Sequence, residues 1–201
     1  MGLKIEYGLG QTPLPEELKL GLKIKTITTR SELDRYEQRN IIQALRWLAP
    51  SKIQAETLLS ASFLNQLHTK MYGDVWAWAG TYRTFETNIG VPYYRIGTEL
   101  KQLLDDVLYW YHHQTYEPAE LALRCKHRLV SIHCYPNGNG RHSRLVADLV
   151  MEKLYSLAYF PWGNSKLVAD DEIRKTYIKA LQHADQGEMG PLMSFAQWSD
   201  L

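Results

Sequence analysis

Cysteine is scarce in this sequence, which has only two among its 201 residues, Cys125 and Cys134. They stand nine positions apart, which is neither a redox CxxC pair nor the spacing of a zinc knuckle. This scarcity excludes a disulfide framework and a cysteine-rich metal site as the basis of the fold. Both thiols are expected to stay reduced, so we expect a cytoplasmic protein.

Several other signals are missing as well. No apolar run approaches the length of a membrane span, and residues 1–14 lack the apolar stretch of a signal peptide. The net charge is only +1 and the two signs are interleaved, so neither a membrane nor nucleic acid is expected as a direct partner. The patterns HExxH and GxxxxGK followed by Ser or Thr are absent, which excludes a zincin-type protease and a P-loop.

What is present is an ordinary globular composition, with 45% hydrophobic and 22% charged residues. A chain of this length favours one domain with a single core. Glycine and proline interrupt residues 1–30, so we expect an irregular lead there and one domain over 31–201. The aromatic residues, 11% of the chain, are interpreted as core packing rather than as a base-stacking surface.

Apolar residues recur at helical spacing through most of the domain. Thr98 and Asp170 are suited to N-cap positions, and Pro118 and Pro191 to the first turns of helices. The predicted helices cover 31–48, 55–72, a stretch from Thr98 to Tyr111, 118–132, 141–155 and a final pair that begins near 170 and 191.

Residues 81–97, TYRTFETNIGVPYYRIG, have a different pattern. They are rich in β-branched and aromatic residues, with Asn88, Gly90 and Pro92 as turn formers near the middle. We predict a short β-hairpin here, so the expected fold class is mainly α with one small hairpin. The edge of such a hairpin could pair with an extended peptide; the alternative is a plain surface turn.

The most informative segment begins at His133 and reads HCYPNGNGRHSR. Gly138 and Gly140 stand just before a predicted helix, where free backbone amides and the helix N-terminus can bind phosphate oxygens. Arg141 and Arg144 are three residues apart, so we expect both to reach one side of the first turn and bind a di- or triphosphate. From the other side of the turn, the His133 imidazole could take a proton from an attacking hydroxyl.

Each element of this segment also has a purely structural interpretation. A GNG turn alone is often a helix entry, and a lone histidine at a helix end is more often a cap or a core residue than a base. The combination with two arginines favours a function, because glycine and arginine contribute little to a hydrophobic core.

The segment resembles the motif of the Fic family, which reads His, any residue, Phe, any residue, Asp or Glu, GNGR, two residues and Arg. The similarity extends from about Ser31 onward: TFETNIGVPYYRIG stands where Fic proteins carry a substrate-binding flap, and ALQHADQGEMGPLMSF is similar to a Fic C-terminal segment. GDVWAWAGTYR, the NIG turn and the GQTPL lead resemble the subgroup called mobile mystery protein B. The resemblance implies a Fic-type helical bundle with a small β-hairpin flap.

The resemblance also implies an activity, the transfer of AMP or another NMP from a nucleoside triphosphate, expected to be ATP, to a Tyr, Thr or Ser hydroxyl of a target protein. His133 would be the general base, Arg141 would bind the β or γ phosphate, and Arg144 the γ phosphate. The phosphates would also be held by the backbone amides of Gly138, Asn139 and Gly140.

Other positions follow from the same resemblance. Tyr135 takes the place of the family's Phe and is expected to be a buried anchor. Asn137 takes the place of the acidic residue that binds Mg²⁺ in Fic enzymes, and its amide oxygen lacks the negative charge that hard cations prefer, so we expect a weak metal ligand. The flap residues Asn88, Ile89 and Gly90 would dock the target protein.

Glu37 matches the inhibitory glutamate of many Fic proteins, although Leu33 and Gln38 differ from the residues that flank it in the family. If the match holds, Glu37 binds Arg144 and blocks the γ phosphate; otherwise it belongs to a solvated helix face. The subgroup resemblance suggests a small helix-turn-helix protein as an antitoxin-like partner. Two alternatives stay open: a nucleotide-binding regulatory or toxin–antitoxin module protein with little or no turnover, and a phosphotransferase that uses the same site.

Overall fold

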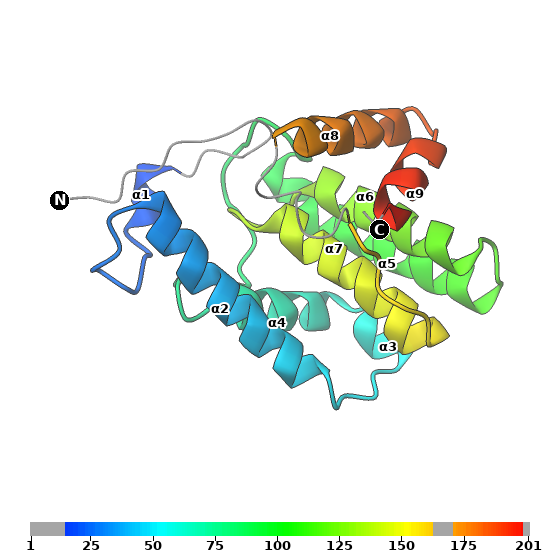
Figure 1. Ribbon diagram of the computed structural model, residues 1–201, viewed down its shortest axis with the longest axis horizontal. Coiled ribbons are helices and arrows are strands. Elements are labelled where there is room, and N and C mark those ends of the chain that lie inside the picture. Colours follow the sequence, from blue (N-terminus) through cyan, green and yellow to red (C-terminus); the bar gives the residue numbers. More distant parts are fainter. Residues whose placement is uncertain (1–14, 163–170, 199–201) are drawn as a thin grey trace.

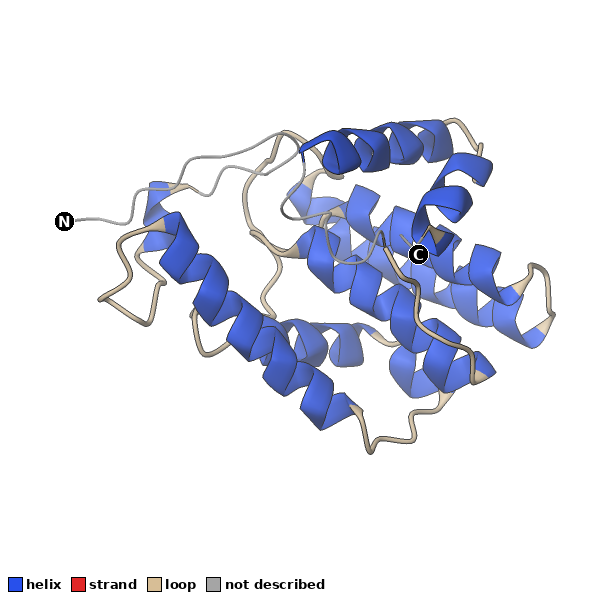
Figure 2. Cartoon of the chain, viewed as in Figure 1, coloured by secondary structure: helices blue, strands red, loops and turns tan. Residues whose placement is uncertain are grey.

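The computed structural model describes residues 15–162 and 171–198, which form helices joined by loops (Figure 1, Figure 2). No residue in these two stretches belongs to a strand, and the pairing of Leu22 with Trp76 is an isolated bridge. The predicted class, mainly α, is therefore confirmed. The elements are α1 Glu16–Lys19, α2 Arg30–Leu48, α3 Ala55–Leu58, α4 Ala61–Tyr72, η1 Tyr93–Arg95, α5 Ile96–His112, α6 Pro118–Ile132, α7 Asn139–Leu149, η2 Val150–Leu154, α8 Asp171–Asp185 and α9 Gly190–Gln197.

Helix α2 begins where its sequence provides a capping box. The Thr29 side chain accepts a hydrogen bond from the Glu32 backbone amide, and the Glu32 carboxylate accepts one from the Thr29 amide. A cap of this kind contributes about 1 kcal/mol. The helix buries one stripe of side chains against α4, which it crosses in Figure 1. The prediction of a helix over 31–48 is confirmed, and the buried stripe consists of Leu33, Glu37, Asn40, Ala44 and Leu48.

The predicted helix over 55–72 is two helices, α3 and α4. The break occurs because Ser60 takes an extended backbone and its hydroxyl accepts a hydrogen bond from the Phe63 amide, which starts a new helix. The apolar spacing continues across the break, and for that reason the pattern suggested one continuous helix.

The centre of the fold is made by α4, α5, α6 and α7, which pack against one another. Their facing side chains are fully buried, and each contributes about 1.5–3 kcal/mol by leaving water. Examples are Leu64, Leu67, Val107, Leu121 and Val146. Helices α6 and α7 are consecutive in the chain, so the turn between them lies at the edge of this core.

The predicted helix starts are partly confirmed. Pro118 and Pro191 both occupy the first turns of their helices, α6 and α9. Thr98 is not an N-cap, because the 3-10 turn η1 leads directly into α5 at Ile96. Asp170 and the GQTPL lead lie outside the described residues. None of the described helices is long and apolar enough to cross a bilayer.

The predicted β-hairpin does not form; residues 81–92 are a loop (Figure 2). Its two arms do not pair with each other, because each is bonded to the end of α6. The Arg83 amide donates to the Cys134 carbonyl across 2.9 Å, and the Val91 amide donates to the Ile132 carbonyl across 3.3 Å. Backbone groups that would have formed a ladder thus bind the turn that contains the motif histidine.

Candidate active site

The turn between α6 and α7 places a histidine in an unusual backbone conformation. His133 follows the last residue of α6 and has φ 58° and ψ 60°, the left-handed region that normally favours glycine. Such a conformation costs about 1 kcal/mol or more for a residue with a β-carbon, and it persists only when the surroundings enforce it. At this turn a buried arginine enforces the conformation.

That arginine, Arg83, is a site residue that the sequence reasoning missed. Its guanidinium is 2% exposed and donates hydrogen bonds to four backbone carbonyls. The Arg83 Nε donates to the His133 carbonyl across 2.7 Å, and the other acceptors are the carbonyls of Phe85, Val91 and Ile132. A cation at the C-terminus of α6 is favoured by the helix dipole. The sequence indicated this role only weakly, because Arg83 is a single arginine in an aromatic stretch.

The His133 side chain is buried in this conformation, with 5% of its surface exposed. Burial lowers its pKa to about 4; a hydrogen bond with the Val130 backbone opposes the change, and the Arg83 charge adds to it. The ring is therefore neutral near pH 7 and able to accept a proton. Gly90 lies beside the His133 Cβ, because a β-carbon on Gly90 would come within 2.8 Å of that atom.

The glycine turn is held by the side chain of Asn139. Its Oδ1 accepts the Tyr135 amide across 2.9 Å, and its Nδ2 donates to the Tyr135 carbonyl across 2.7 Å. Gly138 has φ +79°, and a β-carbon there would come within 2.6 Å of the Tyr72 ring. The turn therefore requires glycine at 138 for both conformation and space.

The predicted phosphate nest is only partly available. The Gly138 amide donates to the Asn137 Oδ1 across 2.6 Å, so this predicted phosphate donor is occupied. The first three residues of α7 are Asn139, Gly140 and Arg141, and the amides of such positions have no partner within their own helix. The amides that lack such a partner are thus those of Asn139, Gly140 and Arg141, one residue further along the chain than the predicted set.

Tyr135 is the buried anchor that was predicted. It is 1% exposed, and its hydroxyl donates to the Asn65 Oδ1 across 2.8 Å. Its ring stacks on His68 with centroids 3.8 Å apart. His68, a second residue that sequence reasoning missed, accepts the Gly80 amide at Nδ1 across 3.0 Å. Its proton is therefore on Nε2, which donates to the Asn137 carbonyl across 3.1 Å and so ties α4 to the turn.

Glu37 reaches the motif from α2, but through a different arginine from the one expected. It is 4% exposed, so it does not belong to a solvated face. Its Oε2 accepts from the Arg141 guanidinium across 2.6 Å, and its Oε1 accepts from the Trp76 indole across 2.7 Å. The predicted partner was Arg144. Arg141 is the one within reach because it lies on the side of α7 that carries its guanidinium over the Tyr72 ring, 5.1 Å from the centroid.

Arg144 lies on another side of α7, over the ring of Tyr177 in α8, with its Cζ 5.7 Å from the centroid. The two motif arginines therefore do not converge in this conformation, contrary to the expectation that both reach one side of the first turn. Arg141 contacts α2 and α4, and Arg144 contacts α8.

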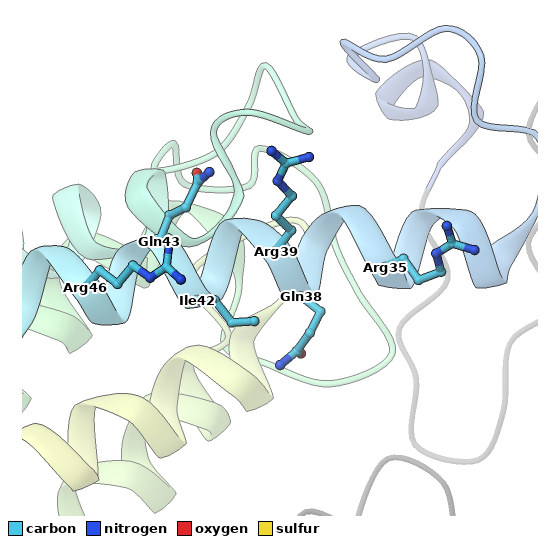
Figure 3. A pocket seen from close by; sticks show the side chains of 6 residues that line it. All are labelled: Arg35, Gln38, Arg39, Ile42, Gln43 and Arg46. Atoms are coloured by element: carbon cyan, nitrogen blue, oxygen red, sulfur yellow. The ribbon is translucent and has the colours of Figure 1, made fainter.

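A shallow hollow on the exposed side of α2 does not belong to this site. Figure 3 shows its lining side chains spread along one helix. They include neither Glu37 nor a residue of the motif, and they are Arg35, Gln38, Arg39, Ile42, Gln43 and Arg46. This hollow adds nothing to the chemistry at the α6–α7 turn.

The donor set at the turn does not fit a magnesium ion held by the protein. Asn137 provides a neutral amide oxygen, and that oxygen already accepts the Gly138 amide. The nearby carboxylate of Glu37 is bound by Arg141 and Trp76. In the part of the chain that the structure describes, no three His, Cys, Asp or Glu side chains are grouped to hold a metal. Magnesium prefers anionic oxygen ligands, and the Glu37 carboxylate is already bound by Arg141 and Trp76.

Comparison with known proteins finds a family that this chain resembles. Residues 58–151 match the model of the Fic/DOC family. The matched stretch contains α4 to α7 and therefore the α6–α7 turn.

More particularly, the curated relatives are named adenylyltransferases. Protein adenylyltransferase fic-1 of Caenorhabditis elegans is 26% identical over 193 residues, which are 93% of this chain and 35% of that protein. Protein adenylyltransferase Fic of Nematostella vectensis is 23% identical over 170 residues, 83% of this chain and 38% of that protein. The chain thus spans little more than a third of the length of these relatives.

Solved structures share the fold. A structure of Fic-1 from C. elegans superposes with a TM-score of 0.67 at 24% identity, covering 90% of this chain and 52% of that one. BepC of Bartonella tribocorum, solved with bound AMPPNP, gives a TM-score of 0.62 at 19% identity, covering 85% and 87%. The arrangement of helices is therefore that of a Fic domain.

Proposed function

We propose that this domain is a protein nucleotidyltransferase, which moves AMP or another NMP from a nucleoside triphosphate to a Tyr, Thr or Ser hydroxyl of a target protein. The observation that carries the proposal is the α6–α7 turn, where a neutral histidine closes one helix and a glycine turn opens the next. The names of the curated relatives support the same activity.

The residues of the turn suit each part of this reaction. The neutral His133 ring takes the proton of the target hydroxyl, whose oxygen then attacks the α phosphorus as the bond to pyrophosphate breaks. The amides at the start of α7 bind phosphate oxygens, and the helix dipole favours their negative charge. Arg141 and Arg144 neutralise the charge that develops on pyrophosphate as it leaves. ATP is the proposed donor, by analogy with the AMPPNP complex of BepC.

The described conformation is a closed one. Glu37 occupies the Arg141 guanidinium, and the loop at Gly90 covers His133. A nucleotide phosphate that binds Arg141 must displace the Glu37 carboxylate, because both are anions that compete for the same donors. We therefore propose that Glu37 is inhibitory, through Arg141, and that activation requires movement of α2.

The exposed tip of the 81–92 loop is proposed as the target-docking flap. Arg83 and Val91 anchor its two arms to the end of α6, whereas Asn88, Ile89 and Gly90 are exposed. Ile89 exposes 46% of its surface and is therefore available for contact with a target chain. A target segment bound here would lie beside His133.

The remaining parts of the proposal depend on the subgroup resemblance and on composition. We propose a cytoplasmic location and a small helix-turn-helix protein as an antitoxin-like partner, with no direct role for nucleic acid or membrane. No step is assigned to Mg²⁺, because the protein donors do not fit it.

The activity can be tested by labelling. The full chain is incubated with a cell lysate and ATP, CTP, GTP or UTP labelled at the α phosphate, in its native form and as Glu37→Gly. Transfer of the α label to the chain itself or to a lysate protein is expected, stronger in the variant. The matched control is His133→Asn, because asparagine tolerates the left-handed conformation yet provides no base. If no nucleotide labels any protein, even with Glu37→Gly, the proposal is wrong.

The same experiment separates the two alternatives. A phosphotransferase would transfer label from the γ phosphate and not from the α phosphate. A binding protein without turnover, which the occupied Asn137 oxygen favours, would show nucleotide affinity by calorimetry but no transfer from either position.

A further inference from the structure

Two cationic side chains, one from α6 and one from α7, lie over a buried tyrosine ring of α8. The Lys126 Nζ lies 4.5 Å from the centroid of the Tyr177 ring, and the Arg144 Cζ lies 5.7 Å from the same centroid. Lys126 is 0% exposed and Tyr177 is 7% exposed. Neither the Lys126 Nζ nor the Tyr177 hydroxyl makes a hydrogen bond of good geometry with any described residue. A fully buried lysine without such a bond is rare, because its desolvation is costly.

The acids that face this cluster are engaged elsewhere. Asp185 shares a hydrogen bond of 2.8 Å with His127, and Asp148 accepts hydrogen bonds from Phe160 and Trp162. Among the described residues, neither carboxylate forms an ion pair with a member of the cluster. Within that part of the chain, the cluster therefore has two cationic side chains and no anion paired with them.

The pKa values of Lys126 and Tyr177 are both affected by their surroundings in this cluster. Burial lowers the pKa of Lys126. Burial alone would raise the pKa of Tyr177, but the charges of Lys126 and Arg144, together with their polar contacts to its hydroxyl, outweigh that effect and lower it. An anion that reached Arg144 would relieve the repulsion between the two cations, and in a low-dielectric environment that relief is large.

The cluster is connected to the motif through Arg144. This arginine lies one helical turn beyond Arg141 in α7, and Lys126 lies on α6, which packs against α7. Tyr177 is in turn held by α9, where its ring contacts Phe195 with centroids 5.2 Å apart. The C-terminal helices thus fix a ring against which the Arg144 side chain is placed.

We propose that Lys126 and Tyr177 are positioning residues for Arg144: they hold its guanidinium ready for the terminal phosphate of a nucleoside triphosphate and so give the site its preference for triphosphates. This inference rests on the proposed function. Both residues act through Arg144. The positive charge of Lys126 and Arg144 is offset when the phosphate binds.

The test is a comparison of affinities for ATP, ADP, AMP and inorganic tripolyphosphate, measured by calorimetry on the full chain. The parent protein carries Glu37→Gly so that Arg141 is available, and Lys126→Met, Lys126→Arg and Tyr177→Phe are added to it. Lys126→Met is expected to reduce the ratio of ATP affinity to AMP affinity about tenfold, because a charge-assisted phosphate contact is weakened. Lys126→Arg should restore most of the ratio. Tyr177→Phe should reduce it several-fold, because the hydroxyl that interacts with both Lys126 and Arg144 is lost, and tripolyphosphate binding should weaken in parallel.

Tyr177→Phe keeps the ring and removes only a hydroxyl that lacks a good hydrogen bond with the described residues, so this variant is expected to fold even if Lys126→Met does not. If the parent binds ATP and the ratio stays unchanged in the folded variants, or if ATP and AMP affinity fall equally, the inference is overturned while the proposed function stands. If the parent binds no nucleoside triphosphate, the proposed function fails and this inference fails with it.

Discussion

The Glu37 carboxylate accepts a hydrogen bond from the Arg141 guanidinium across 2.6 Å, over a separation of 104 residues in the chain. This contact joins α2 to the first turn of α7, and the Trp76 indole holds the other carboxylate oxygen. A buried carboxylate with two donors of this kind is fixed in place. The position of α2 therefore determines whether the Arg141 guanidinium is free, and the proposed nucleotide binding depends on that.

Replacing Glu37 by Gln should separate the structural and inhibitory parts of this contact. The amide retains an acceptor but loses the charge, so the unfolding free energy should fall by about 2 kcal/mol, as for loss of a hydrogen bond to a charged group. ATP affinity should rise at least about tenfold, because the competing anion is gone. Chemical denaturation and calorimetry measure the two effects.

The matched control for that change is Asp34→Asn on the same helix. Asp34 is half-buried and pairs with Arg30 across 2.8 Å, so its loss should change stability by less than about 1 kcal/mol. Its charge acts on Arg141 without contacting it, so ATP affinity should change much less than in Glu37→Gln. Equal ATP affinity in native protein and Glu37→Gln would show that the carboxylate does not compete with nucleotide.

Gly90→Ala should displace the loop from the motif histidine. Gly90 has φ +112°, and a β-carbon would come within 2.7 Å of the Arg83 Nη2 and 2.8 Å of the His133 Cβ. We expect a loss of about 1–3 kcal/mol in unfolding free energy from backbone strain. Hydrogen exchange should also accelerate at the Val91 amide, which bonds to the end of α6.

Gly97→Ala is the control for this substitution. Gly97 lies within α5, and no atom of the described residues outside its own turn would come within 4 Å of an added β-carbon. Alanine should therefore stabilise the protein by about 0.5–1 kcal/mol. Unchanged exchange at Val91 in Gly90→Ala would contradict the account of the loop as a cover for His133.

Asn137→Asp should introduce a dependence on Mg²⁺. A carboxylate at 137 can still accept the Gly138 amide with one oxygen and offers the second, charged oxygen to a hard cation. We expect the ATP affinity of this variant to rise with Mg²⁺ at least several-fold more than that of the native protein. Asn137→Ala is the control, with no added ligand. The same Mg²⁺ response in all three proteins would mean that residue 137 does not affect the metal.

Asp148 should make stability depend on pH. Burial raises its pKa to about 7, against the opposing hydrogen bonds from Trp162 and Phe160, whereas the unfolded value is 3.8. Between these values the folded state keeps a proton that the unfolded chain releases, so this residue's contribution falls as pH rises through about 4 to 7 and is constant above. Across this window the loss should be about 4 kcal/mol.

The measurement for Asp148 is the difference in unfolding free energy between native protein and Asp148→Asn. Asparagine does not titrate and can still accept a hydrogen bond from Trp162. The difference, native minus variant, should therefore decline from pH 4 to pH 7, because contributions from the buried histidines cancel. A difference that is flat or rises over this range would contradict the raised pKa.

Much of the fold could be predicted because its signals are local. The prolines at 118 and 191 and the apolar stripes act over three or four residues, so they indicated helices without knowledge of the tertiary structure. The order of the motif, from His133 through GNGR to Arg144, was likewise sufficient to predict a turn between two helices.

The errors in the site arose where distant groups compete for the same donors and acceptors. The arms of the 81–92 loop had the composition of a hairpin, yet their amides found better-placed carbonyls at the end of α6. The motif position of Asn137 suggested a metal ligand, although its oxygen is bound by the next amide along the chain.

By itself the sequence determined the helices, the class of fold and the position of the motif, since each depends on short-range spacing and caps. Only the tertiary structure decided that Glu37 binds Arg141 rather than Arg144, and that Lys126 and Arg144 meet at Tyr177. These pairings depend on how α2, α6, α7 and α8 are rotated against one another, and that rotation is set by the packing of the whole core.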